Sequence, residues 1–264
     1  MKTKSSLKNK VLNWEKTGKY YVEWVAKTPL RDYFFKNVNF ENFSVWWITN
    51  ICGKDNVVNN NWYYQLRDIL FENEHIVFNK FKFYLIFFIK LIKNFITSLF
   101  WCFFIKLIFF TRFNKISRRY CFNAYHFNFV KKKNLVFDRL FGVAPIKKNK
   151  NQNYYLIHIQ SQKEFISSIF NFKKKAKKLG IPLFISNEYI KISDIIKIYY
   201  FSIISVIKVL NYIKLKRNFF YINQKDCSNV LIPMLISSFS GNIQASLIYA
   251  KALYNFFSIN NTKT

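Results

Sequence analysis

Two adjacent tryptophans, Trp46 and Trp47, open the part of the chain whose residue types best suit ligand binding. Lys54 and Asp55 follow in an asparagine-rich stretch, and Tyr64 lies farther along. Aromatic faces stack on the C–H edges of sugars, while lysine, carboxylate and amide groups bond to hydroxyls or to a phosphate. We therefore predict that these five residues bind a sugar or a sugar phosphate.

The same pattern has a second interpretation, in which the tryptophans fill the core and residues 53–61 form a polar surface loop. Neighbouring side chains on a helix or a strand cannot face the same way. Two surfaces must therefore meet at Trp46 and Trp47, whichever interpretation holds.

Motifs that would identify a reaction are missing from the sequence. It contains only five glycines and has no GxGxxG, GxxxxGK[ST], HExxH or GxSxG motif. The four cysteines have no CxxC spacing and are accompanied by three histidines, which argues against a zinc site and for a reducing compartment. We predict no metal and no cofactor, and the sequence identifies no catalytic residue.

The segment Phe83–Phe110 is almost wholly apolar but carries Lys90, Lys93 and Lys106. Its longest lysine-free run, Asn94–Ile105, is too short to span a bilayer, which takes about 20 residues. A charge at the bilayer centre also costs roughly 2.5–3.5 kcal/mol. A helix lying in the membrane interface therefore fits better than a clean span, although a buried helix of a soluble domain and a true span both stay open.

The positive charge of the chain, +29 in all, is densest around this apolar segment. Residues 76–137 contain twelve basic and no acidic side chains. A polybasic flank of this kind suits an anionic membrane surface. Alternatives are a solvated lysine face and a coding bias, since the abundant Lys, Asn, Ile, Phe and Tyr have AT-rich codons.

The pattern beyond the apolar segment predicts alternating strands and helices. A buried strand, Tyr154–Gln160, precedes a helix with a capping box at Ser161 and Glu164, and Ile181–Ser186 is the next strand. A second helix runs from Ser193 to about Lys214. Short links between such elements are typical of a parallel sheet with right-handed crossovers.

We therefore predict an α/β chain of three regions, with two helices around Gly241 at its end. The regions are an aromatic-rich N-terminal region of mixed structure (1–78), a basic apolar helix (79–119) and a small Rossmann-like parallel-sheet half-domain (120–264).

Several blocks carry a resemblance to a known family. VWWITNICGKDNVVNNNWYYQLRDIL, DRLFGVAP, NYYLIHIQ, KKLGIPLFISNEYI and LISSFSGNIQASLIYAKALYNFF occur in that order. They resemble bacterial surface-carbohydrate biosynthesis proteins of O-antigen and capsule clusters, which are GT-B-like glycosyltransferases. The resemblance implies sugar transfer from an activated nucleotide by a protein peripheral to the cytoplasmic face of the inner membrane. The five candidate site residues named above would then contact a lipid-linked or phosphorylated sugar acceptor.

Two departures from that family bear on activity. Gly53 stands where members tend to carry a glutamate, which removes a candidate acid or base. Members are also about twice as long, and their nucleotide-sugar domain would lie beyond Thr264. The resemblance thus implies an acceptor-side part that is inactive without a separate nucleotide-sugar-binding domain or chain.

Two other classes of protein stay open. One is a basic RNA-binding protein of the organellar ribosomal type, which the sequence disfavours because most aromatics lie in apolar, core-like runs. The other is a small membrane protein with one degenerate span.

Overall fold

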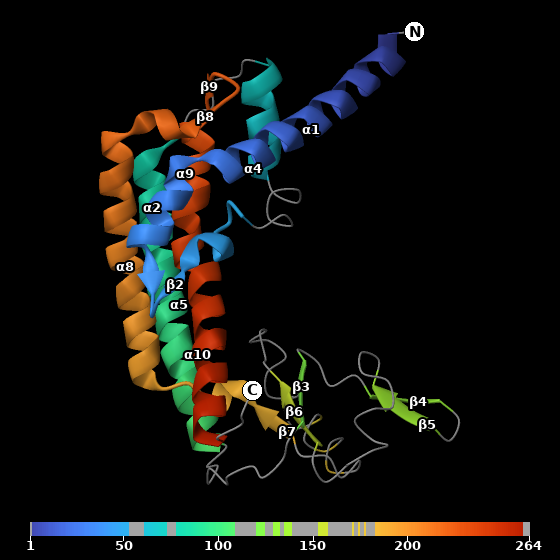
Figure 1. Cartoon of the computed structure of the whole chain (residues 1–264), viewed down its shortest axis with the longest axis vertical. Coiled ribbons are helices and arrows are strands. Elements are labelled where there is room, and N and C mark those ends of the chain that lie inside the picture. Colours follow the sequence, from blue (N-terminus) through green and yellow to red (C-terminus); the bar gives the residue numbers. More distant parts are fainter. Residues whose placement is uncertain are drawn as a thin grey trace. The chain divides into compact units, whose positions relative to one another are not determined.

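Long helices dominate the computed structural model (Figure 1). It describes residues 2–52, 61–72, 78–108, 120–124, 129–132, 135–138, 153–157, 171, 174, 177 and 183–260. The four longest helices are α1 (Lys2–Lys27), α5 (Lys80–Ile108), α8 (Ile192–Leu215) and α10 (Asn242–Asn260).

Shorter elements connect these helices. The α-helices are α2 (Pro29–Asn37), α4 (Asn61–Arg67) and α9 (Ser228–Ser237). The single turns are η1 (Val45–Ile48), η2 (Asp68–Glu72), η4 (Ser186–Tyr189), η5 (Arg217–Phe220) and η6 (Ser238–Ser240). Two antiparallel pairs, β1 (Asn39–Phe40) with β2 (Phe43–Ser44) and β8 (Tyr221–Ile222) with β9 (Lys225–Asp226), form tight hairpins.

Side-chain caps fix where several helices begin. The Thr28 hydroxyl accepts a hydrogen bond from the Leu30 N–H, and Pro29 occupies the first turn of α2, where its missing N–H costs nothing. Asn79 Oδ1 accepts from the Lys82 N–H at 2.9 Å and so caps α5. Gly241 separates η6 from α10, so the predicted pair of helices around this glycine is confirmed.

The predicted Rossmann-like α/β fold is wrong. Within the described residues, the parallel strands β3 (Tyr120–Ala124), β6 (Asn153–Ile157) and β7 (Leu183–Ile185) are five residues long or shorter, and the antiparallel pair β4 (Phe129–Lys132) and β5 (Leu135–Asp138) lies outside their sheet. Helices make up most of the described structure. The chain is a helical protein with small accessory strands.

The physical reason lies in the elements that come after α8. A doubly wound half-domain needs each crossover helix to lead into another parallel strand. Here α8 leads into the hairpin of β8 and β9 and then into α9 and α10. The parallel pairing of β6 with β7 is present, as predicted for these two segments, but its ladder covers only three residue pairs. The predicted capped helix between them lies largely outside the described residues.

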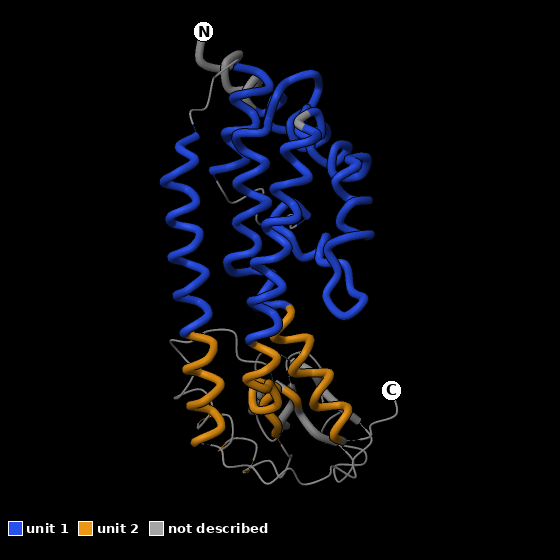
Figure 2. The backbone as a smooth tube through the Cα atoms, turned by 90° about the vertical axis from the view of Figure 1, so that its left-hand side faces the viewer, with its two compact units in different colours: residues 1–96, 196–246 blue, residues 97–195, 247–264 orange. Residues whose placement is uncertain are grey.

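The chain divides into two compact units (Figure 2). Unit 1 comprises residues 1–96 and 196–246, and unit 2 comprises residues 97–195 and 247–264. Each unit is thus assembled from segments that are distant in the sequence, whereas the predicted regions were contiguous. The helices α5, α8 and α10 each contribute residues to both units.

An aromatic cluster forms part of the core of unit 1. The rings of Phe34 and Trp46 meet edge to face at 5.3 Å, and Phe239 lies 6.3 Å from Phe34. All three side chains are fully buried. Burial of a side chain of this size contributes roughly 2–3 kcal/mol, so these contacts hold α2, η1 and η6 together.

Unit 2 combines a small apolar cluster with a buried polar network. Leu156, Tyr189 and Phe256 pack together, and the Tyr189 and Phe256 rings meet at 4.8 Å. Beside Tyr189, the Asn255 Nδ2 group donates to Asp194 Oδ2 at 2.8 Å and to the Tyr189 carbonyl at 3.0 Å. Hydrogen-bonded polar groups therefore join α10 to the start of α8.

Candidate functional site

The structure places the two predicted tryptophans on opposite sides of η1. Trp46 is 0% exposed and Trp47 is 59% exposed, so two surfaces do meet there. The faces of the Trp46 ring are covered by core residues and are not open to a sugar. Its indole Nε1 has no hydrogen-bond partner among the described residues, which marks Trp46 as a packing residue that was buried at some cost.

Tyr64, the other predicted site residue that the structure describes, makes its ring contacts away from Trp47. Tyr64 is 48% exposed, but its ring contacts Trp14 at 5.1 Å and receives the Arg67 guanidinium at 5.6 Å. Trp47 instead meets the Phe35 ring at 5.9 Å. Lys54 and Asp55 lie outside the described residues, so their place in an acceptor site stays a prediction.

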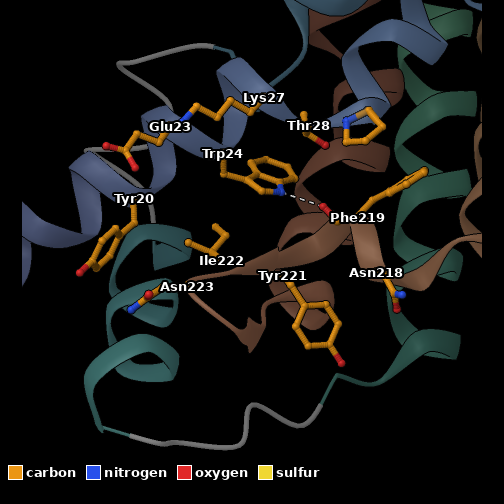
Figure 3. A pocket seen from close by; sticks show the side chains of 11 residues that line it. Tyr20, Glu23, Trp24, Lys27, Thr28, Asn218, Phe219, Tyr221, Ile222 and Asn223 are labelled. Carbon is orange, nitrogen blue, oxygen red and sulfur yellow. Dashed lines mark hydrogen bonds between the residues drawn. The ribbon is translucent and has the colours of Figure 1, made fainter.

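A pocket of about 400 Å³ lies elsewhere in unit 1, between the end of α1 and the segment around η5 and β8 (Figure 3). Trp24 forms its centre, and the indole N–H donates to the Phe219 carbonyl at 2.7 Å. This bond fixes the ring across a sequence separation of 195 residues. The aromatic and polar side chains drawn around it include Tyr20, Glu23, Lys27, Asn218, Tyr221 and Asn223.

The chemistry of this pocket matches what was predicted for the tryptophan pair. Aromatic rings lie beside one carboxylate, one ammonium group and two amides, which is the donor and acceptor set that sugar hydroxyls require. Sequence inspection missed the pocket because its two walls come from opposite ends of the chain. The only local sign of this pocket in the sequence is the aromatic pair Phe219 and Phe220 before the β8–β9 hairpin. Such a pair is more typical of the apolar core than of a binding site.

A second feature is the exposed side of α5. Phe81, Leu85, Phe88, Ile89, Ile92 and Ile96 are all exposed, and at 100° per residue they fall within an arc of about 100°. We call these six residues the α5 surface. Lys82 and Lys93 lie within about 40° of one edge of that arc, and Lys90 lies farther round the helix. The buried Phe87 and Leu91 lie outside the arc, beyond its other edge and behind it.

Helix α8 repeats this pattern within unit 1. Ile196, Tyr200, Ile203 and Ile207 are exposed and share one side of the helix, with Lys197 and Lys208 beside them. We call these four apolar residues the α8 surface. Exposed apolar residues that occur singly need no explanation, but continuous stripes do.

Two helical stretches of the described chain are long and apolar enough to cross a membrane, by length and composition. They are Lys80–Leu107, in α5, and Ser228–Ile259, which includes α9 and α10. The two stretches differ in burial: 61% of the apolar window is buried in the second stretch and only 17% in the first. The second therefore serves as core, whereas α5 is apolar without being covered.

The described residues offer no metal site and no activated thiol. They contain no group of three or more His, Cys, Asp or Glu side chains that could hold a metal ion. Burial raises the pKa of Cys52 to about 11 and that of Cys227 to about 12, so both thiols are protonated at neutral pH. A protonated thiol is a poor nucleophile.

Comparison with known proteins adds no assignment. No protein-family model matches the chain, and neither a curated protein nor a solved structure matches it. The chain is a helical protein, and its most prominent features among the described residues are the α5 surface, the α8 surface and the aromatic pocket.

Proposed function

We propose that this protein binds the surface of an anionic membrane through one side of its helical bundle. The observation that carries the proposal is the α5 surface, an uncovered apolar stripe with lysines along its edge. In such a stripe, apolar side chains insert into the bilayer while lysines are attracted to anionic headgroups. Each basic residue near anionic lipid contributes about 1 kcal/mol to binding.

The position of the lysines favours an interfacial helix over a span. Lys93 lies beside the midpoint of α5, where a spanning helix would place it at the bilayer centre. At an interface, the same lysine reaches the headgroups from the edge of the stripe. The α8 surface, with Lys197 and Lys208, supports the same orientation of unit 1.

Vesicle flotation tests this proposal directly. The full chain is expected to float with vesicles that contain anionic phospholipid and to be released largely by high salt or alkaline carbonate. Retention in carbonate until detergent is added would instead mean a true span. A chain that stays at the bottom of the gradient with every vesicle composition would refute membrane binding.

RNA binding is less well supported. Phosphates attract the lysines, but exposed isoleucines such as Ile92 and Ile96 have no partner on a nucleic-acid backbone. The apolar content of the stripe therefore favours lipid.

We further propose that the bound protein takes part in surface-polysaccharide assembly, on the acceptor side, at the cytoplasmic face of the inner membrane. The sequence resemblance suggests this role, and the aromatic pocket around Trp24 favours a sugar-binding contribution. The proposal is one of acceptor binding, and a nucleotide-sugar domain would come from elsewhere.

Binding of hexose 1-phosphates, followed by ligand-observed NMR, tests the acceptor role. Tyr221→Ala should weaken binding by roughly tenfold, since stacking on an aromatic ring contributes about 1 kcal/mol or more. Tyr254→Ala, which removes an exposed tyrosine of α10, is the matched control and should have no effect.

A separate arm with Trp47→Ala and Lys54→Ala tests the site predicted from the sequence. A loss confined to this arm would move the acceptor site to Trp47 and Lys54. Unchanged binding in both arms, or no binding by the unmodified chain, would refute the acceptor role.

A further inference from the structure

A second cavity of unit 1, larger than the aromatic pocket, is a groove of about 730 Å³. Its walls are the first turns of α5, the last turns of α8 and the start of α9. We call it the α5–α8 groove. Pockets of this size accept small molecules of drug or cofactor dimensions.

The floor and one end of the groove are apolar. Val206, Ile213 and Phe220 are buried and form its deep part, while Phe88 and Ile207 are exposed at its rim. Phe88 belongs to the α5 surface and Ile207 to the α8 surface. The groove therefore opens between the two stripes that we assign to the membrane.

The other end of the groove is polar and carries cations. Lys80, at the first position of α5, and Lys214, in the last turn of α8, both line it and are exposed. The N-terminus of the 29-residue helix α5 adds the positive end of a helix dipole at Lys80. The remaining polar side chains are Asn211, Asp226, Ser228 and Asn229.

Asp226 is the one carboxylate among these lining residues, and a hydrogen bond to one of its oxygens limits its repulsion of a bound anion. Its Oδ1 atom accepts from the Ser228 N–H at 2.8 Å, so this oxygen is engaged at the start of α9. The two lysines outnumber it. The polar end thus suits a single anionic group better than a cation.

We propose that the α5–α8 groove binds a lipid that bears a phosphate, with a hydrocarbon chain between Phe88 and Val206 and the phosphate at Lys80 and Lys214. The eight residues from Lys80 to Phe88, and likewise from Val206 to Lys214, span about 12 Å of helix. This length lets one chain lie along the groove. This inference rests on the proposed membrane association in one respect only, which is that the membrane would supply the lipid.

Calorimetry with decyl phosphate tests the groove without a bilayer. The full chain is kept in solution by an amphipathic polymer, and decanol and inorganic phosphate serve as probes that lack one half of the ligand. Decyl phosphate should bind at least tenfold more tightly than either. Lys80→Gln combined with Lys214→Gln should weaken it by roughly ten- to hundredfold, the range for hydrogen bonds to a charged group.

Lys197→Gln combined with Lys208→Gln is the matched control, because both lysines lie on α8 outside the lining. It should leave decyl phosphate binding unchanged. Equal binding of decanol, equal binding of inorganic phosphate, or no effect of the groove variant would each overturn the proposal. Vesicle flotation separates the two proposals. A chain that floats with vesicles but does not bind decyl phosphate would contradict only the groove proposal. A chain that binds decyl phosphate but does not float would contradict only the membrane proposal.

Discussion

Replacing two isoleucines of the α5 surface, Ile89→Gln with Ile96→Gln, should lower the affinity for anionic vesicles by at least about 100-fold. Burying one such side chain contributes about 1.5–3 kcal/mol, and each 1.4 kcal/mol changes the affinity tenfold. Glutamine is a polar side chain of similar size and adds no charge. The loss of affinity therefore measures the insertion of apolar side chains into the bilayer and not a change in electrostatic attraction. Flotation at a series of vesicle concentrations measures this affinity.

The control for this variant removes equally exposed valines elsewhere. Val11 and Val22 of α1 are 54% and 61% exposed, against 56% and 60% for Ile89 and Ile96. Val11→Gln with Val22→Gln should leave vesicle binding within a factor of about two, because isolated surface apolar residues are common and carry little function. An equal loss in both variants would mean that the isoleucines have no special place at the membrane.

Salt gives an independent measure of the lysine contribution. Attraction between exposed charges is screened over about 8 Å at physiological ionic strength and over about 3 Å at 1 M. Binding of the unmodified chain should therefore weaken in high salt, while the effect of the isoleucine variant should persist. If salt removes both effects, the α5 surface acts only through its lysines.

The sequence shows part of this surface but not its orientation. The lysine-punctuated run from Phe83 predicts an apolar helix with basic flanks, and α5 is such a helix. Which side is covered depends on tertiary contacts, since Phe87 and Leu91 differ from Phe88 and Ile92 only in position. The choice among an interfacial, a buried and a spanning helix could therefore not be made from composition.

The fold shows how a correct local signal led to a wrong general conclusion. The parallel ladder of β6 and β7 and the break at Gly241 arise from turn chemistry and periodicity, which are local. The conclusion that α8 is a crossover helix needed a further strand, and β8 and β9 form a hairpin instead. Apolar helices that pack against other helices and those that cover a sheet have the same sequence pattern.

The candidate sites also combine features that the sequence could predict with features that it could not. That Trp46 and Trp47 face different surfaces is a consequence of their adjacency alone. The pocket around Trp24 could not be foreseen, because the hydrogen bond to Phe219 joins residues 195 positions apart. The α5–α8 groove was hidden for the same reason, since Lys80 and Lys214 come together only through the packing of α5, α8 and α9.

The second large effect is expected in the buried polar network of unit 2. Asn255→Leu should destabilise the protein by about 2–4 kcal/mol, because it removes two hydrogen bonds and leaves buried oxygens with fewer donors. Asp194 and Asn255 are both buried. The Asp194 carboxylate would keep the Lys191 N–H, at 3.1 Å, but lose the Asn255 amide, and the Tyr189 carbonyl would lose that amide as well.

Urea unfolding in a mild detergent, followed by near-UV circular dichroism, measures this change against Asn211→Leu. Asn211 lies exposed on α8, so its replacement should alter stability by no more than about 0.5 kcal/mol. Asp194→Leu combined with Asn255→Leu should recover part of the loss, because replacing both partners of a buried polar pair by apolar groups is far less costly than orphaning one. The coupling between the two sites should be about 1–3 kcal/mol, as for residues in direct contact. If the two single losses simply add in the double variant, Asp194 and Asn255 stabilise unit 2 independently, and the joint between α8 and α10 depends on the packing of Tyr189 against Phe256 instead.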